Sequence, residues 1–284
     1  MSTETSVIHD IGYQRYTGPR LGRGYAVRSL YIHALRTAFG LGRSAKAKIF
    51  PWIVCGIMLL VAVIVTAVRS QIGEVVLEYR DLPDSLSAVI VLFLAVIAPE
   101  LVSRDLRSGV LPLYFSRPIQ RTDYAFAKLG ALITAAWLLL AVPMLVMYAG
   151  AAFGADHLAD VWREADDFGK GLAYAALYAL VFAPIAMLVS SFTGKRAFAA
   201  GGVVAIFLVT APIVGVLGFV GNQTTRDLAL LASPQTMVYG VKSWLIEPQQ
   251  DVVGAYGPVY GMAAVALICL CVLLLVVRYG KVAR

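Results

Sequence analysis

Six long apolar runs limit most strongly what this chain can fold into. Each has the roughly 20 residues that a helix needs to cross the hydrocarbon core of a bilayer. Hydrophobic residues make up 60% of the chain and charged residues only 14%, outside the usual range for a soluble domain. We therefore expect an all-α polytopic membrane protein with six transmembrane helices. The expected spans are residues 49–68, 86–102, 129–152, 171–192, 197–221 and 259–277.

The second run differs from the other five. It carries Pro99 and Glu100 near its end, whereas the other runs contain no Asp, Glu, Lys or Arg. Because proline removes a helical hydrogen bond, we expect this helix to end or kink there. Ion-coupled transporters usually place ionisable residues in mid-membrane, so the clean runs make a secondary transporter a less favoured alternative.

Charges on the connecting segments predict the orientation. Eighteen of the 24 Lys and Arg residues lie in the N-terminal segment, residues 103–128, the 195–196 link and the C-terminal tail, and twelve of the 17 acidic residues lie in the other loops. Since cytoplasmic flanks carry the basic excess, both termini are predicted to be cytoplasmic, in a multi-pass protein of the plasma membrane. Spread along membrane-flanking segments, these basic residues favour anionic lipid headgroups as partners over nucleic acid.

The segment before the first run predicts an additional helix. Residues 1–24 read as a flexible cytoplasmic arm, and residues 25–284 as the six-helix transmembrane domain. Apolar residues recur at helical spacing from Tyr25 to Phe39 with cationic residues between them, and Gly40 and Gly42 supply a turn into the membrane. This pattern indicates a helix in the membrane interface. A helix packed against the protein's own cytoplasmic loop is the alternative.

The loops on the opposite side are acidic, and the last of them is long. Their carboxylates are expected to form a solvated surface, because nothing in their spacing fixes the geometry of a metal site. The segment 222–257 contains two apolar stretches, 228–232 and 237–245, that are too short to span the membrane. They are predicted to form half-helices that dip into the outer leaflet or cap a cavity.

Several enzyme classes are disfavoured because their motifs do not occur. The sequence contains no Gly-x-x-x-x-Gly-Lys-Ser/Thr phosphate loop, so the chain is not expected to hydrolyse ATP itself. It also contains no His-Glu-x-x-His and no Gly-x-Ser-x-Gly. A membrane enzyme that uses Glu100 and Arg104 on a lipid is an alternative, although these residues lie one helical turn apart and pair more simply with each other.

The segment after the second run is the most informative. Leu106, Val110, Leu113 and Tyr114 are spaced for one face of a short helix, which Pro112 must end or distort. A turn at Pro118 with Thr122 as helix N-cap is then expected to lead into the third span. Such a helix suits either a docking surface or a loop that rests on the bilayer.

This segment resembles the corresponding loop of ABC-2 type transporter permease subunits. Those proteins follow the second span with charged residues, a Gly-Thr/Val-Leu step, a short apolar run, a small-x-Pro element, an Arg, and a Lys at the start of the third span. The six-span layout and a Ser233-Pro234 element extend the resemblance over roughly residues 25–280. The family often has Glu where this chain has Ser108 or Pro112. The matching residues are Gly109, Val110, Leu111, Pro118, Arg121 and Lys128.

The resemblance implies a transport subunit of an ABC exporter and not an enzyme. Two such permeases, identical or paralogous, would assemble with two separately encoded ATPase subunits, which bind the ATP and Mg, so no cofactor is expected in this chain. The 103–125 segment would be the coupling element seated in an ATPase groove, and an Asp at Arg107 or Tyr114 is expected to uncouple transport. The coupling residues implied are Arg104, Asp105, Leu106, Arg107, Gly109, Val110, Tyr114, Phe115, Arg117, Pro118 and Arg121.

Overall fold

The computed structural model describes residues 18, 21–109, 119–155, 157–250 and 252–281. All regular elements in these residues are helices, which confirms the predicted all-α fold. Six helical segments are long and apolar enough to cross a membrane, as predicted. The helices concerned are α2 (Ala45–Ile72), α4 (Ser87–Leu101), α7 (Arg121–Phe153), α8 (Leu158–Ser191), α9 (Arg196–Val220) and α12 (Gly257–Lys281).

Shorter helices lie at the two ends of this bundle. The segment 222–257 forms two short helices and three 3₁₀ turns. Its second apolar stretch, 237–245, lies entirely within one of these helices, α11. The short helices are α1 (Arg23–Ala38), α3 (Leu82–Ser85), α5 (Ser103–Ser108), α10 (Gln223–Ala229) and α11 (Pro234–Leu245).

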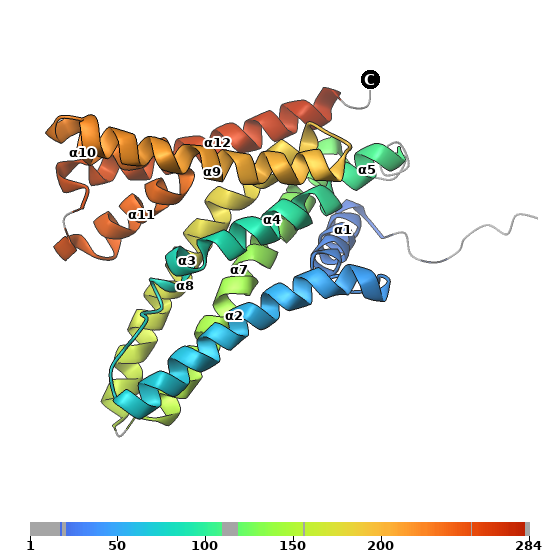
Figure 1. The fold of residues 1–284 in the computed structure, drawn as a ribbon. Coiled ribbons are helices and arrows are strands. Elements are labelled where there is room, and N and C mark those ends of the chain that lie inside the picture. Colours follow the sequence, from blue (N-terminus) through green and yellow to red (C-terminus); the bar gives the residue numbers. More distant parts are fainter. Residues whose placement is uncertain (1–17, 19–20, 110–118, 156, 251, 282–284) are drawn as a thin grey trace, which may run out of the picture.

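The long helices are packed around α7 and α8, and they diverge toward one end. In Figure 1, α2 follows α7 and α8 toward one corner, whereas α9 and α12 run toward another, with α3 and α11 between them. Buried aromatic side chains of α8, among them Tyr174, Tyr178 and Phe182, fill the centre of the bundle. The outer faces of α2, α9 and α12 keep exposed apolar side chains, as helices surrounded by lipid do.

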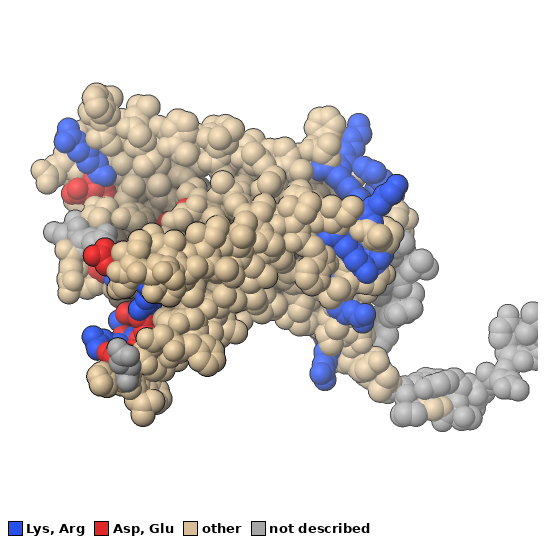
Figure 2. Space-filling view, turned by 60° about the horizontal axis from the view of Figure 1, so that its bottom comes forward, with Lys and Arg blue, Asp and Glu red and all other residues tan. Residues whose placement is uncertain are grey.

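Charge separates the two ends of the molecule. Figure 2 shows Lys and Arg gathered at one end, most Asp and Glu at the other, and a broad uncharged belt between them. We call the end with α1 and α5 the basic end, and the end with α3, α10 and α11 the acidic end. This arrangement suits a bundle whose belt lies in hydrocarbon and whose two ends reach water.

Helix α1 packs against the bundle at the basic end. Leu30, Ala34 and Ala38 are buried, and α1 contacts α7 and α4. The turn that follows needs glycine, because Gly40 has φ +68° and a Cβ there would lie 2.7 Å from the carbonyl oxygen of Ala47. Helix α1 therefore forms where the sequence predicts it and packs against α7 and α4, while its position in the membrane interface stays a prediction.

Two predicted helix starts are corrected. Thr122 is not the N-cap of α7: Gln120 is, and its backbone N–H donates to the Asp123 carboxylate at 3.0 Å in a capping box. Helix α8 begins at Leu158, well before the expected span at 171, because its charged first turns continue the helix beyond the apolar run. Pro99, by contrast, lies in the last turn of α4, as predicted.

Candidate functional site

The predicted coupling segment begins with α5, at the basic end. This helix follows α4 directly and ends at Gly109, whose φ of +64° makes it a left-handed C-cap. The last helical residue of α5 is therefore Ser108. The remaining predicted coupling residues, Val110, Tyr114, Phe115, Arg117 and Pro118, lie outside the described residues, as does the side chain of Leu106.

Two hydrogen bonds attach α5 to the end of α8 and the α8–α9 link. The buried hydroxyl of Ser103 donates to the carbonyl oxygen of Ser190 at 2.8 Å. Arg107 Nε donates to the carbonyl oxygen of Gly194 at 3.0 Å, while the rest of the Arg107 side chain is exposed. A displacement of α5 would therefore act directly on two spanning helices.

Asp105 points toward the bundle and joins α5 to α7. Its carboxylate accepts a hydrogen bond from the Tyr124 hydroxyl at 2.6 Å and from Lys128 Nζ at 2.9 Å. The Lys128 ammonium is buried and also donates to the carbonyl oxygen of Leu101 at 2.9 Å. Tyr124 in turn packs edge-on against Tyr279 of α12. Asp105 is thus part of an internal polar contact between helices.

Arg121 connects the start of α7 to the end of α12. Its guanidinium donates to the carbonyl oxygen of Gly280 at 2.6 Å. At the neighbouring end of α1, Arg23 forms an ion pair with Asp123 at 2.6 Å. The hydrogen bond with Asp123 raises the pKa of Arg23 above its ordinary value. The helix ends at the basic end are therefore held to one another by polar side chains.

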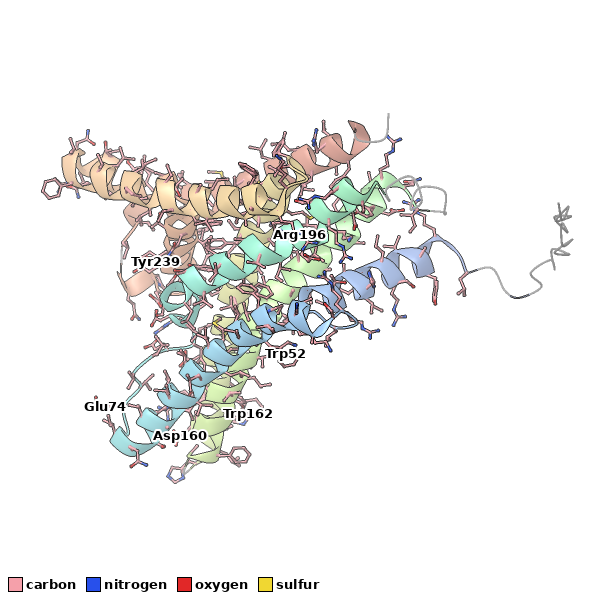
Figure 3. The ribbon with its side chains drawn as sticks, turned by 45° about the vertical axis from the view of Figure 1, so that its right-hand side comes forward. Trp52, Glu74, Asp160, Trp162, Arg196 and Tyr239 are labelled. Carbon is pink, nitrogen blue, oxygen red and sulfur yellow. The ribbon has the colours of Figure 1, made fainter. Side chains whose placement is uncertain are left out.

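Glu100, at the end of α4, binds three arginines from three parts of the chain. Its carboxylate lies 2.5 Å from Arg43, 2.6 Å from Arg196 and 3.3 Å from Arg104. The expected pairing of Glu100 with Arg104 is confirmed, whereas its contacts with the other two arginines could not be read from local spacing. Figure 3 shows Arg196 well away from Glu74 and Asp160, which lie together at the other extremity.

A second polar cluster lies at the acidic end, around Lys242 of α11. Its ammonium is 2.5 Å from Asp81, 3.2 Å from Asp84 and 3.6 Å from Glu247, with 1% of the side chain exposed. Asp84 also accepts hydrogen bonds from the hydroxyls of Tyr174, at 2.7 Å, and Tyr178, at 3.2 Å. The cluster fastens α11 to α3 and to the middle of α8.

The ionisation of this cluster follows from its burial. Burial alone lowers the pKa of Lys242. The hydrogen bonds that its ammonium donates to Asp81 and Asp84, together with their negative charges, outweigh burial and hold that pKa above its ordinary value. Burial raises the pKa of Asp84. The hydrogen bonds that its carboxylate accepts from Tyr174, Lys242 and Tyr178 lower this pKa by less, so it stays above its ordinary value. Lys242 is therefore a charged side chain with little access to water, and it depends on its carboxylate partners.

No sequence motif marks Lys242 as a buried residue. It is one of the few basic residues in the predicted outward loops, and it lies inside the otherwise apolar stretch 237–245. A single cation within the amphipathic run 237–245 was the available signal, because such a residue is costly to bury without a partner. Among the described residues, no group of three or more His, Cys, Asp or Glu side chains is placed to hold a metal ion.

Comparison with known proteins identifies one family. A family model described as "ABC-2 family transporter protein" matches residues 83–278. No curated protein matches the chain. The matched range runs from α3 through most of α12 and contains α5, Glu100 and Lys242.

Proposed function

Because the chain belongs to the ABC-2 family of transporter proteins, we propose that it is the membrane subunit of an ATP-driven exporter and couples to a separate ATPase. The chain is an ABC permease with several membrane-spanning helices. Permeases of this family generally work with a separate ABC ATPase.

The observation that carries the coupling route is the set of bonds around α5. Ser103 and Arg107 hold the end of α8 and the α8–α9 link, and Asp105 holds α7. Tyr124 extends the contact to α12 through Tyr279. A push on α5 from an ATPase subunit would therefore be transmitted to α7 and α8, to α12 through Tyr279, and to α9 through the short α8–α9 link. Coupling by rigid-body motion needs this kind of connection.

The surface available to an ATPase is basic. Arg104 and Arg107 are exposed on α5, and Arg196 is exposed at the start of α9. Positive side chains on this surface suit a partner whose docking groove carries carboxylates. In this arrangement two copies of the permease, or this chain and a paralogue, each present one α5 to one ATPase subunit.

The charge distribution supports an orientation with the basic end in the cytoplasm. Lys and Arg gather at that end of the bundle (Figure 2), and cytoplasmic flanks of membrane proteins carry this excess. Both termini would then be cytoplasmic, in the plasma membrane, and α5 would face the compartment that holds ATP. Transport out of the cytoplasm is the direction that the family resemblance favours.

The enzyme alternative has less support in the geometry. It requires Glu100 and Arg104 to act on a lipid, but the Glu100 carboxylate is bound by three guanidinium groups. A carboxylate so occupied is poorly placed to accept a substrate proton.

Purification with an affinity tag from the native cell, in mild detergent, tests the coupling proposal. We expect a soluble protein with a phosphate loop to co-purify in stoichiometric amount and to hydrolyse ATP. In the variant Arg107→Asp, which reverses the charge on the exposed face of α5, recovery of that ATPase is expected to fall at least about fivefold, since like charges oppose docking.

A matched variant at the acidic end controls for the charge change itself. Arg163→Asp makes the same substitution on an exposed arginine of α8, far from α5, and should leave recovery of the ATPase unchanged. Purification of the wild-type chain without any ATPase, or equal recovery with both variants, would contradict the coupling proposal.

A further inference from the structure

A cavity opens at the basic end, between the α1–α2 turn and the α4–α5 junction. Its volume is about 590 Å³, which lies in the range of small-molecule sites. Arg43 and Ser44 line it from the start of α2, Thr37 from α1, and Arg104 and Lys128 from α5 and α7. We call it the elbow cavity.

The elbow cavity carries more positive than negative charge. Arg43, Arg104 and Lys128 line it together with the carboxylates of Glu100 and Asp105. Arg196, which also binds Glu100, raises the excess to two positive charges. Three guanidiniums held around a single carboxylate repel one another, so a second anion would stabilise this arrangement.

Hydrogen-bond donors in the elbow cavity also exceed the acceptors. A guanidinium has five N–H donors, whereas one carboxylate offers about four acceptor positions. Within the described chain, Arg43 and Arg104 have Glu100 as their only side-chain partner, and both line the cavity. Ser44, at the N-cap of α2, makes no side-chain capping bond and also lines the cavity. Fork-shaped guanidinium donors match the oxygens of a phosphate group.

An exposed apolar face begins one to two helical turns further along α2. Ile49, Trp52 and Ile53 share this face by their spacing and are each more than half exposed. At 1.5 Å per residue, they lie roughly 7–14 Å along the axis from Ser44. Figure 3 shows Trp52 projecting outward from α2. Tryptophan is typical of the boundary between headgroups and acyl chains.

These observations together point to a lipid. The charged, donor-rich cavity suits a phosphate group. The apolar face further along α2 suits hydrocarbon chains. A phospholipid carries its phosphate and its acyl chains in this same order. We propose that the elbow cavity binds the phosphate group of an anionic phospholipid, whose acyl chains lie along Ile49, Trp52 and Ile53. The net positive charge favours an anionic lipid over one whose headgroup adds an ammonium. This inference does not depend on coupling to an ATPase.

Native mass spectrometry of the purified full chain tests the proposal, with phosphatidylglycerol and phosphatidylcholine as the two probe lipids. We expect phosphatidylglycerol to bind at least about tenfold more tightly. In the double variant Arg43→Gln/Arg104→Gln that preference should disappear, since charge-assisted hydrogen bonds are lost. Arg36→Gln removes an exposed charge from α1 outside the cavity, and should retain the preference.

A second variant keeps the test informative if the double variant does not fold. Glu100→Gln removes the competing negative charge but keeps an oxygen acceptor for the arginines. Phosphatidylglycerol should then bind more tightly than to the wild-type chain. Weaker binding by this variant would overturn the proposal.

Fluorescence quenching locates the acyl chains. In a variant that keeps Trp52 and replaces Trp137, Trp162 and Trp244 with Phe, phosphatidylglycerol with brominated chains should quench more strongly than brominated phosphatidylcholine. Equal quenching by both lipids, or equal loss of affinity in Arg36→Gln, would overturn the proposal in favour of general surface attraction. Binding of inorganic phosphate without phosphatidylglycerol would overturn the lipid assignment and leave a free-phosphate site.

Discussion

At the scale of single residues, Lys242 best illustrates how position decides the role of a side chain. On an exposed loop it would be one more solvated cation. On α11 it is almost completely covered, and Asp81, Asp84 and Glu247 surround its ammonium. Removal of the cation would leave three carboxylates close together, of which, within the described residues, only Glu247 would still be paired, to Arg80 at 2.9 Å. That is less favourable than an exposed ion pair that loses one partner.

We therefore expect Lys242→Met to lower the stability of the protein by about 2–4 kcal/mol. This value lies somewhat below that for a fully buried pair, because Asp81 and Asp84 retain some contact with water. Thermal unfolding of the purified chain in detergent, followed by tryptophan fluorescence, measures the change. Lys170→Met is the control: its partners Asp166 and Asp167 are exposed to water, so the unfolding midpoint is expected to stay nearly unchanged. Equal shifts of the unfolding midpoint in both variants would show that the ion pairs of Lys242 contribute no more to stability than the exposed ion pairs of Lys170.

At the scale of elements, the contact between α2 and α7 depends on a glycine. Gly150 of α7 faces Thr66 of α2, and a Cβ added at Gly150 would overlap the Thr66 methyl group. Small residues at such positions let helices approach closely in a membrane, where packing drives their association. The contact lies near the end of α2 that is away from α1.

Gly150→Ala is expected to lower stability by about 1–3 kcal/mol, since the methyl group must force the two helices apart. The measurement is the unfolding midpoint in detergent. Gly56→Ala provides the matched comparison, because a Cβ at Gly56 meets no atom within 4 Å. There alanine should be neutral or slightly stabilising, as a better helix former. An unchanged unfolding midpoint in Gly150→Ala would mean that α2 and α7 leave room for a methyl group between Gly150 and Thr66.

At the scale of the whole molecule, the separation of charge between the two ends predicts how the chain sits in the membrane. Arg163 is exposed at the acidic end and Arg36 at the basic end. After Cys55, Cys269 and Cys271 are replaced, a single cysteine at either position reports its side. A membrane-impermeant maleimide should label Arg163→Cys in intact cells and label Arg36→Cys only after permeabilisation, because basic flanks stay in the cytoplasm.

The reverse labelling pattern would place the basic end outside and remove the proposed access of α5 to ATP. Labelling at both positions in intact cells would contradict a single orientation. A control without cysteine establishes that the reagent reads the introduced thiols alone.

Much of this architecture could be predicted before any coordinates. The six spans, the additional N-terminal helix and the turn at Gly40 follow from hydropathy, helical periodicity and backbone chemistry, and the structure confirms them. Helix ends were harder to predict. The N-cap of α7 is Gln120 and not Thr122, because the capping partner is Asp123 three residues on, and the early start of α8 has no apolar signal.

The candidate site could be predicted only as a segment. The family resemblance predicts that its charges face a docking partner, yet Asp105 accepts hydrogen bonds from Tyr124 and Lys128, and Arg121 donates one to the end of α12. These partners come from other helices, so no local spacing reveals them. Whether a charge on α5 faces a partner or its own bundle depends on how the helices cross.

The number of spanning helices, their alternating direction and the charge at each end follow from hydropathy and from the placement of charges along the chain. Hydrocarbon thickness and the need to satisfy every backbone hydrogen bond within a helix leave an apolar chain little choice. Which ions meet depends instead on how the helices pack. Lys242 and Asp81 lie 161 residues apart in the chain, and Glu100 collects arginines from the start of α2, from α5 and from α9. The packing of helices brings these charges to one place, where the loss of water makes each depend on its partner.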